Sequence, residues 1–74
     1  MLSEETIRQN LIRLRKEHDM TQKKVAELLC KSRGAYTAYE HGYAVPSYMT
    51  LERLSEIYGV SIEIWGKEES FAVS

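Results

Sequence analysis

The sequence predicts an all-α fold in which five short helices pack as one compact domain. Hydrophobic residues recur at helical spacing in successive segments, and a serine or threonine stands directly before each of them. Turns of two to five residues separate the segments, and no segment has the alternating pattern of a β-strand. With 74 residues, the chain is expected to form a single domain.

The first two helices are indicated by their caps and by one apolar face each. Ser3 is placed to cap a helix that runs from about residue 4 to residue 18. Its apolar residues recur about one turn apart: Ile7, Leu11 and Leu14. Thr21 is placed to cap a second helix, which ends before Cys30. The apolar face of this second helix consists of Val25, Ala26 and Leu29.

Three further helical segments follow, preceded by Ser32, Ser47 and Ser61. The third helix ends at Gly42 and the fourth at Gly59, because glycine readily adopts the left-handed conformation of a helix end. The expected apolar face of the third helix is Ala35, Tyr36 and Tyr39. The inward residues of the fourth are Leu51, Leu54 and Tyr58. The fifth segment is short and covers residues 62–65.

The composition is that of an ordinary soluble globular protein, with 43% hydrophobic and 28% charged residues. No apolar run approaches the roughly 20 residues that a membrane-spanning helix needs. The polar start MLSEETIRQN is unlike a signal peptide. The single cysteine, Cys30, cannot form an internal disulfide. We therefore expect a cytoplasmic protein with no membrane partner.

Residue types that serve in catalysis and metal binding are present but are not grouped. His18 and His41 stand near helix ends, and neither lies one helical turn from another metal-type ligand. Cys30 has no histidine or aspartate beside it in the sequence. No P-loop and no dinucleotide-binding glycine pattern occurs. The sequence thus predicts no catalytic site, no metal site and no cofactor.

The charge is unevenly distributed along the chain, although the formal net charge is only −1. Residues 1–34 contain eight Lys or Arg and five Asp or Glu, whereas residues 35–74 contain two and six. The low net charge argues against a strong nonspecific nucleic-acid binder. The uneven distribution leaves two interpretations open, a chance feature of a short chain or a basic part that meets phosphates.

The most specific pattern lies in residues 20–65. It consists of the segments MTQKKVAELL, SRGAYTAYEHG and VPSYMTLERLSEIYGVSIEIW. With these segments the chain resembles the Cro and phage-repressor type of helix-turn-helix regulators, the xenobiotic-response-element class. The resemblance implies a lambda-repressor-like DNA-binding domain over residues 1–66, with the helix-turn-helix unit at about residues 21–41. Residues 67–74 are expected to be a disordered tail.

The resemblance also implies roles for individual residues. Gln22 matches a glutamine that touches a DNA phosphate and braces the recognition helix, here about residues 33–41. Glu40 matches an acid that pairs with an arginine of the first helix, here Arg15. The residues matching the groove-facing positions are Arg33, Gly34, Thr37 and Ala38. The flanking residues in positions that often contact the DNA backbone are Lys31, His41 and Tyr43.

Three departures from the family pattern stand out. Cys30 and Lys31 occupy positions where the family has glycine and an aliphatic residue, so Cys30 is expected to adopt a backbone conformation that glycine prefers. After Gly42 the chain has Tyr-Ala-Val where the family has Lys or Arg, which removes phosphate partners. Gly34 and Ala38 offer no side-chain donors or acceptors. We therefore expect few side-chain contacts with the bases, made mainly by Arg33 and Thr37.

Taken with the resemblance, these observations predict a transcriptional regulator of the repressor type that binds a palindromic operator in double-stranded DNA as a homodimer. The sequence does not distinguish repression from activation. Such a protein would be associated with the nucleoid when bound and needs no small-molecule ligand. The expected dimer surface is Ile62, Ile64 and Trp65, with the alternative that Trp65 fills the core. The alternative function is a protein-interaction module on the same fold: an antitoxin, an antirepressor or an adaptor.

Overall fold

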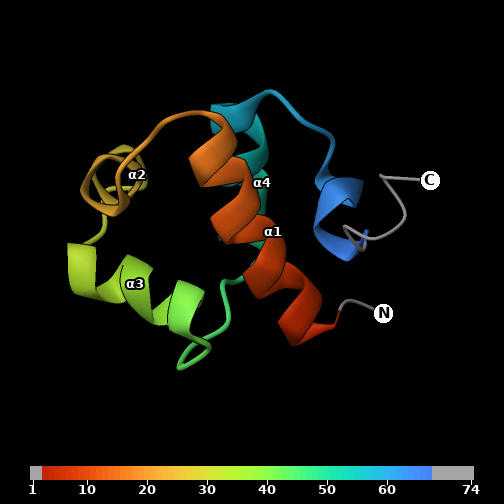
Figure 1. Ribbon diagram of the computed structural model, residues 1–74, viewed down its shortest axis with the longest axis horizontal. Helices are drawn as coiled ribbons and strands as arrows, with labels where there is room; N and C mark the ends of the chain where they lie inside the picture. The colour runs from red at the N-terminus through yellow and green to blue at the C-terminus, as the bar shows by residue number, and fades with distance from the viewer. Residues whose placement is uncertain (1–2, 68–74) are drawn as a thin grey trace.

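The computed structural model describes residues 3–67, and these residues form an all-helical fold. The α-helices are α1 (Glu4–Glu17), α2 (Gln22–Leu28), α3 (Arg33–His41) and α4 (Tyr48–Tyr58), and η1 (Ile62–Gly66) is a 3-10 helix. Helices α2 and α3 lie at one end of the molecule, η1 lies at the other, and α1 and α4 lie between them (Figure 1). The predicted all-α class is confirmed, with the fifth segment formed as a 3-10 helix. The predicted disordered tail lies outside the described residues, apart from Lys67.

The helix starts follow from local hydrogen bonds that the sequence pattern predicts. Each of the five helices is preceded by a serine or threonine whose side-chain oxygen accepts a backbone N–H of the first turn. The donor to Thr21 is Lys24 N at 3.0 Å, and the donor to Ser32 is Ala35 N at 3.1 Å. Each such cap stabilises its helix by about 1 kcal/mol. Among the helices of residues 3–67, none is long and apolar enough to cross a membrane.

The helix ends share a left-handed residue. Asp19, Cys30, Gly42 and Gly59 follow the four α-helices, with φ between 54° and 83°. In each case the next N–H donates to the carbonyl five residues earlier, at 2.9 to 3.1 Å, which satisfies a carbonyl of the last turn. The expected left-handed conformation of Cys30 is therefore confirmed. The left-handed Asp19 was not expected, although the sequence correctly ends the first helix beside it.

The core is one cluster that draws side chains from every helix. Its largest fully buried members include Trp65, Tyr36, Leu11 and Leu54. Trp65 is 0% exposed and donates its indole N–H to the hydroxyl of Ser55 at 2.9 Å. Trp65 thus fills the core, which is the alternative left open by the sequence, and its ring forms no exposed patch. Ile62 and Ile64 are partly buried against the same core, and their predicted role in a dimer stays a prediction.

A buried asparagine fixes η1 against α1. The side-chain nitrogen of Asn10, which is 1% exposed, lies 2.9 Å from the carbonyl oxygen of Ile64 and 2.8 Å from that of Lys67. A longer contact of 3.3 Å joins it to the carbonyl of Trp65. Its side-chain oxygen accepts a hydrogen bond from Arg13 at 3.0 Å. These bonds tie the carbonyls at the end of the short 3-10 helix to α1.

One expected core residue lies outside the core. Ala35 was expected on the apolar face of α3, but it is exposed. Tyr36 is completely buried and Tyr39 is partly buried against the core. The two tyrosines are large enough to fill the space between α3 and its neighbours, so the apolar face of this helix is narrower than the sequence spacing suggested.

Replacing Cys30 by glycine is expected to stabilise the fold. Cys30 is exposed and left-handed, so its side chain adds backbone strain and contributes no burial. We expect Cys30→Gly to raise the free energy of unfolding by about 0.5 to 1 kcal/mol, after subtraction of the greater entropy of glycine in the unfolded chain. Urea denaturation would measure this change. Cys30→Ala keeps the strain and should unfold like the parent, and equal stabilisation by both variants would contradict the explanation.

Candidate nucleic-acid interface

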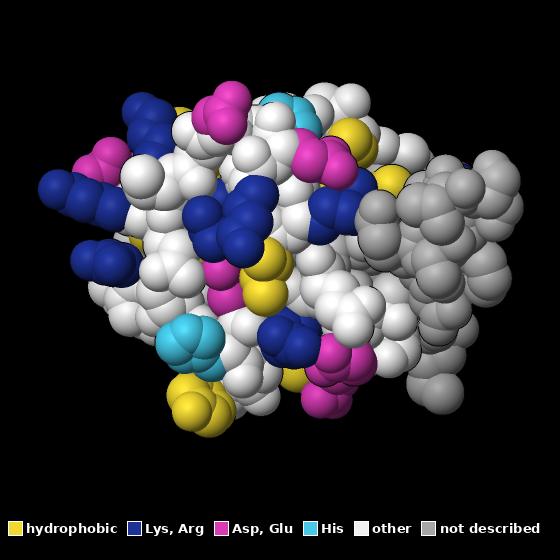
Figure 2. All heavy atoms as spheres, viewed as in Figure 1, with side chains coloured by type: hydrophobic (Ala, Val, Ile, Leu, Met, Phe, Trp, Pro, Cys, Tyr) yellow, Lys and Arg dark blue, Asp and Glu magenta, His cyan; other side chains and the backbone are white. Residues whose placement is uncertain are grey.

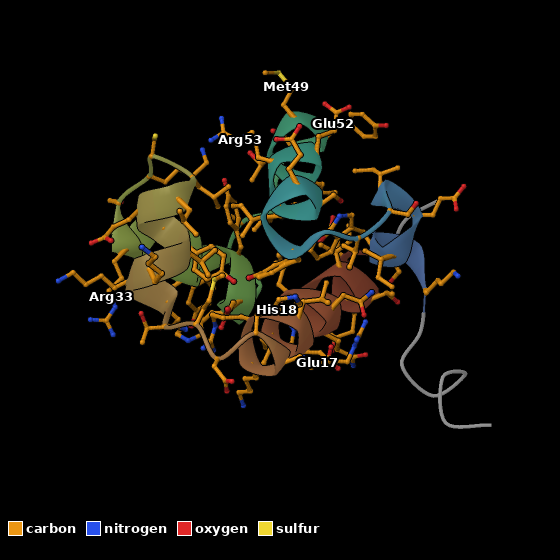
Figure 3. The ribbon with its side chains drawn as sticks, turned by 90° about the horizontal axis from the view of Figure 1, so that it is seen from above. Glu17, His18, Arg33, Met49, Glu52 and Arg53 are labelled. Carbon is orange, nitrogen blue, oxygen red and sulfur yellow. The ribbon has the colours of Figure 1, made fainter. Side chains whose placement is uncertain are left out.

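The outward face of α3 presents side chains that the fold itself does not use. Arg33 is exposed and has neither a hydrogen bond nor an ion pair with any residue from 3 to 67. Its side chain extends away from the body of the molecule at the end where α2 and α3 lie (Figure 3). A guanidinium in this state retains all of its donors for an external partner, such as the O6 and N7 acceptors of guanine.

The other three predicted groove-facing residues lie on the same helix but have fewer hydrogen-bonding groups than Arg33. Gly34 is exposed, and Thr37 and Ala38 are partly exposed. The hydroxyl of Thr37 donates to the carbonyl of Gly34 at 3.1 Å, so its hydrogen is already used within the helix. Its remaining lone pairs and its methyl group are available to a base edge. A Cβ placed on Gly34 would meet no atom within 4 Å.

Toward α1 and α2, α3 is held by a hub centred on the carboxylate of Glu40, which is 2% exposed. Arg15 of α1 donates to both carboxylate oxygens, from Nε at 2.6 Å and from Nη2 at 3.1 Å. The hydroxyl of Tyr36 donates to Oε2 at 2.6 Å. Gln22 donates its amide to Oε1 at 3.0 Å. The contact between Arg15 and Glu40 that the resemblance implied is therefore present, and three helices meet at one carboxylate.

These hydrogen bonds determine the ionisation of the hub. Burial alone would raise the pKa of Glu40, but the hydrogen bonds from Arg15, Tyr36 and Gln22 outweigh burial and hold that pKa below its usual value. The same bond to Glu40 raises the pKa of Arg15. Both partners are thus charged at neutral pH. Arg15 also donates to the carbonyl of Met20 at 3.0 Å, which ties the link between α1 and α2 to the hub.

Gln22 occupies the first position of α2, as expected, and is partly buried. Its amide nitrogen is engaged by Glu40, so the bracing contact implied by the resemblance is present. The amide oxygen of Gln22 cannot bond to the carboxylate of Glu40, because both groups only accept hydrogen bonds. The phosphate contact implied for Gln22 stays a prediction.

The predicted flanking residues lie at two different places. Lys31 is exposed in the turn between α2 and α3, so its charge is in solvent and not in the core. His41 and Tyr43 are exposed at the far end of α3, where their rings make an edge-to-face contact with centroids 5.8 Å apart. The structure therefore places exposed polar groups at both ends of α3.

Arg8 belongs to this region and was not identified from the sequence. Its Nη1 lies 3.4 Å from the carbonyl oxygen of Glu40, and Glu5 accepts from its Nε at 3.0 Å. Hydrogen bonding to Arg8 lowers the pKa of Glu5. Arg8 lies seven residues before Arg15, which places both on one face of α1. This spacing was the available signal that Arg8 also faces α3.

The family follows from a match that includes the helix pair and the Glu40 hub. The helix-turn-helix family model matches residues 11–65, which contain α2, α3 and every residue of the Glu40 hub. The chain belongs to the helix-turn-helix family. In this family the second helix of the pair is the recognition helix, and α3 occupies that place.

Two curated relatives support this placement. The uncharacterized HTH-type transcriptional regulator YqaE of Bacillus subtilis (strain 168) is 44% identical over 62 residues, which cover 84% of this chain and 53% of the relative. The cryptic phage CTXphi transcriptional repressor RstR of Vibrio cholerae is 41% identical over 49 residues, which cover 66% of this chain and 44% of the relative. The chain spans about half the length of these relatives. No solved structure matches it.

Removing the Tyr36 hydroxyl tests the hub of the helix-turn-helix unit. We expect Tyr36→Phe to lower the free energy of unfolding at neutral pH by about 1.5 to 3 kcal/mol, because one hydrogen bond to a buried carboxylate is lost. Because the pKa of Glu40 is lowered, the ionised hub stabilises the fold at pH values above 4.5, the ordinary pKa of a glutamate. This contribution is lost as the pH falls through the folded-state pKa.

The difference in free energy of unfolding between Tyr36→Phe and the parent should therefore become smaller below about pH 4.5. Denaturant unfolding at several pH values would measure it. Tyr39→Phe is the matched control, since the Tyr39 hydroxyl makes no hydrogen bond with residues 3–67. It should leave the stability almost unchanged at every pH. A difference for Tyr36→Phe that stays constant down to pH 3 would contradict the role given to Glu40.

Proposed function

We propose that this protein is a sequence-specific DNA-binding transcriptional regulator that inserts α3 into the major groove. The observation that carries the proposal is the contrast between the anchored and the exposed side chains of α3. Glu40 and Tyr36 bind the helix to the scaffold, whereas Arg33 is exposed without a partner among residues 3–67. Membership of the helix-turn-helix family supports this use of α3. The family is not enzymatic, and no catalytic role is proposed.

The regulator is proposed to act as a homodimer on a palindromic operator. One module of this size covers roughly 600 to 1,000 Å² of DNA-facing surface, and two copies are needed for strong discrimination. Two symmetric copies match two half-sites one helical turn apart. Repression is favoured over activation because the relative RstR is named as a repressor. A protein with this function works in the cytoplasm, on the nucleoid.

A protein-interaction module is the second candidate, and one observation favours it. Residues 35–74 contain six acidic residues and two basic ones, and no Lys or Arg follows Gly42 in the loop before α4. An acidic half of this kind suits contacts with another protein. The salt dependence of retention on duplex DNA separates the candidates, because phosphate binding weakens steeply as the salt concentration rises.

Replacing Arg33 tests the proposed function directly. We expect Arg33→Ala to weaken binding to an operator selected from random duplexes by about 1 to 3 kcal/mol and to relax the base preference at one position of each half-site. Fluorescence anisotropy would measure the affinity, and sedimentation of the complex should give two protomers for each duplex. Lys67→Ala, which follows η1 at the other end of the molecule, is the control and should bind like the parent. Unchanged affinity of Arg33→Ala would refute the assignment of α3.

Gly34 provides a test in which stability and binding are expected to change in opposite directions. A methyl group fits there without contact, and alanine favours helix over glycine by about 0.5 to 1 kcal/mol, so Gly34→Ala should unfold at a higher denaturant concentration. The fold therefore has no need of a glycine here. A close approach of the α3 backbone to the base edges does need one, and the added methyl should lower operator affinity. An increase in both stability and affinity would contradict this explanation.

A further inference from the structure

A hollow of about 540 Å³ lies between α1 and the far end of α3. The polar side chains that line it are Arg8, Arg15, Lys16, Glu40, His41 and Tyr43. Figure 2 shows Lys and Arg side chains gathered across this face of the molecule, over α1 and at the end where α2 and α3 lie. The lining thus combines three cations with one carboxylate, which is itself buried.

The charges of the hollow are only partly balanced. Arg15 is paired with Glu40, and Arg8 is paired with Glu5 on the same face of α1. Lys16 is exposed and has no ion pair among residues 3–67. Lys16 therefore provides an uncompensated positive charge at the rim, and His41 and Tyr43 add polar groups that can hydrogen-bond. Such a rim suits an oxyanion better than a cation or an apolar ligand.

The hollow continues the DNA-facing side of α3. Arg33, Thr37 and His41 recur at intervals of four residues, so they lie along one side of the helix. Eight residues of helix span about 12 Å, which brings the hollow roughly that far from the Arg33 end of the helix. A duplex that lies along this side of α3 and meets Arg33 therefore extends past His41, where its backbone comes beside the hollow.

We propose that this hollow receives a backbone phosphate of the bound duplex, held by Lys16 and His41 at its rim. The proposal rests on the proposed function and adds a site on α1, a helix outside the helix-turn-helix pair. It also offers a replacement for the basic residues that are missing after Gly42, since Tyr43, Ala44 and Val45 follow that glycine. A phosphate contact of this kind positions the protein on DNA without reading a base.

The test is the salt dependence of operator binding by Lys16→Gln. Loss of one phosphate contact per protomer should reduce the steepness of the plot of log affinity against log salt concentration by about 0.9 per protomer, or about twice that for a dimeric complex. The sequence preference among selected operators should not change. Lys16→Arg keeps the charge and should retain the parent slope. Lys67→Gln, beyond η1 at the other end of the molecule, is the matched control and should also retain it (Figure 1).

The outcomes separate this inference from the proposed function. A parent-like slope for Lys16→Gln, together with weakened binding by Arg33→Ala, would overturn the phosphate site and leave α3 as the reading helix. A changed base preference for Lys16→Gln would also overturn it, because Lys16 would then contact a base. Parent-like binding by both variants, or no salt-dependent binding at all, would overturn both proposals. A reduced slope in Lys16→Gln alone, with Lys16→Arg and Lys67→Gln unchanged, would support the site.

Discussion

The buried carboxylate of Glu40 is the interaction on which the arrangement of the recognition helix depends. It accepts hydrogen bonds from Arg15 of α1, Gln22 of α2 and Tyr36 of α3, so one side chain fixes three helices relative to each other. A buried ion pair adds little net stability compared with a well-packed apolar cluster, because both charges lose their water. Its main effect is to fix the relative orientation of the three helices, because charge-assisted hydrogen bonds require a defined geometry and apolar contacts do not.

Because the hub fixes the orientation of α3, different residues of this helix hold the fold and face a partner. Because α3 is anchored through Tyr36 and Glu40, the core does not need the exposed or partly exposed residues Arg33, Gly34 and Thr37. The proposed DNA-facing side of α3, with few hydrogen-bonding side chains, is therefore compatible with a firmly anchored helix. A small domain has few buried contacts to lose, so it benefits when the residues that meet a partner lie outside them.

The local features of the fold were predictable from the sequence, and the long-range contacts were predictable only where a family pattern marks them. Caps such as Thr21 and Ser32 act within one turn, so a short stretch of sequence is sufficient to place helix starts. The pairing of Arg15 with Glu40 was reached through the resemblance. The bonds of Asn10 to η1 had no such marker, because they depend on which segments meet in space. The exposure of Ala35 depends in the same way on the size of its neighbours.

The anchoring of η1 by Asn10 determines where the described chain leaves the domain. The carbonyls of Ile64 and Lys67 are held against α1, so residue 67 has a fixed exit point (Figure 1). That point lies at the opposite end of the molecule from α2 and α3. Any cargo joined after residue 67, such as a fluorescent protein or a surface tether, would therefore be carried on the side away from the groove-facing helix. The geometry makes this end the natural attachment point for immobilising the domain with its reading face free.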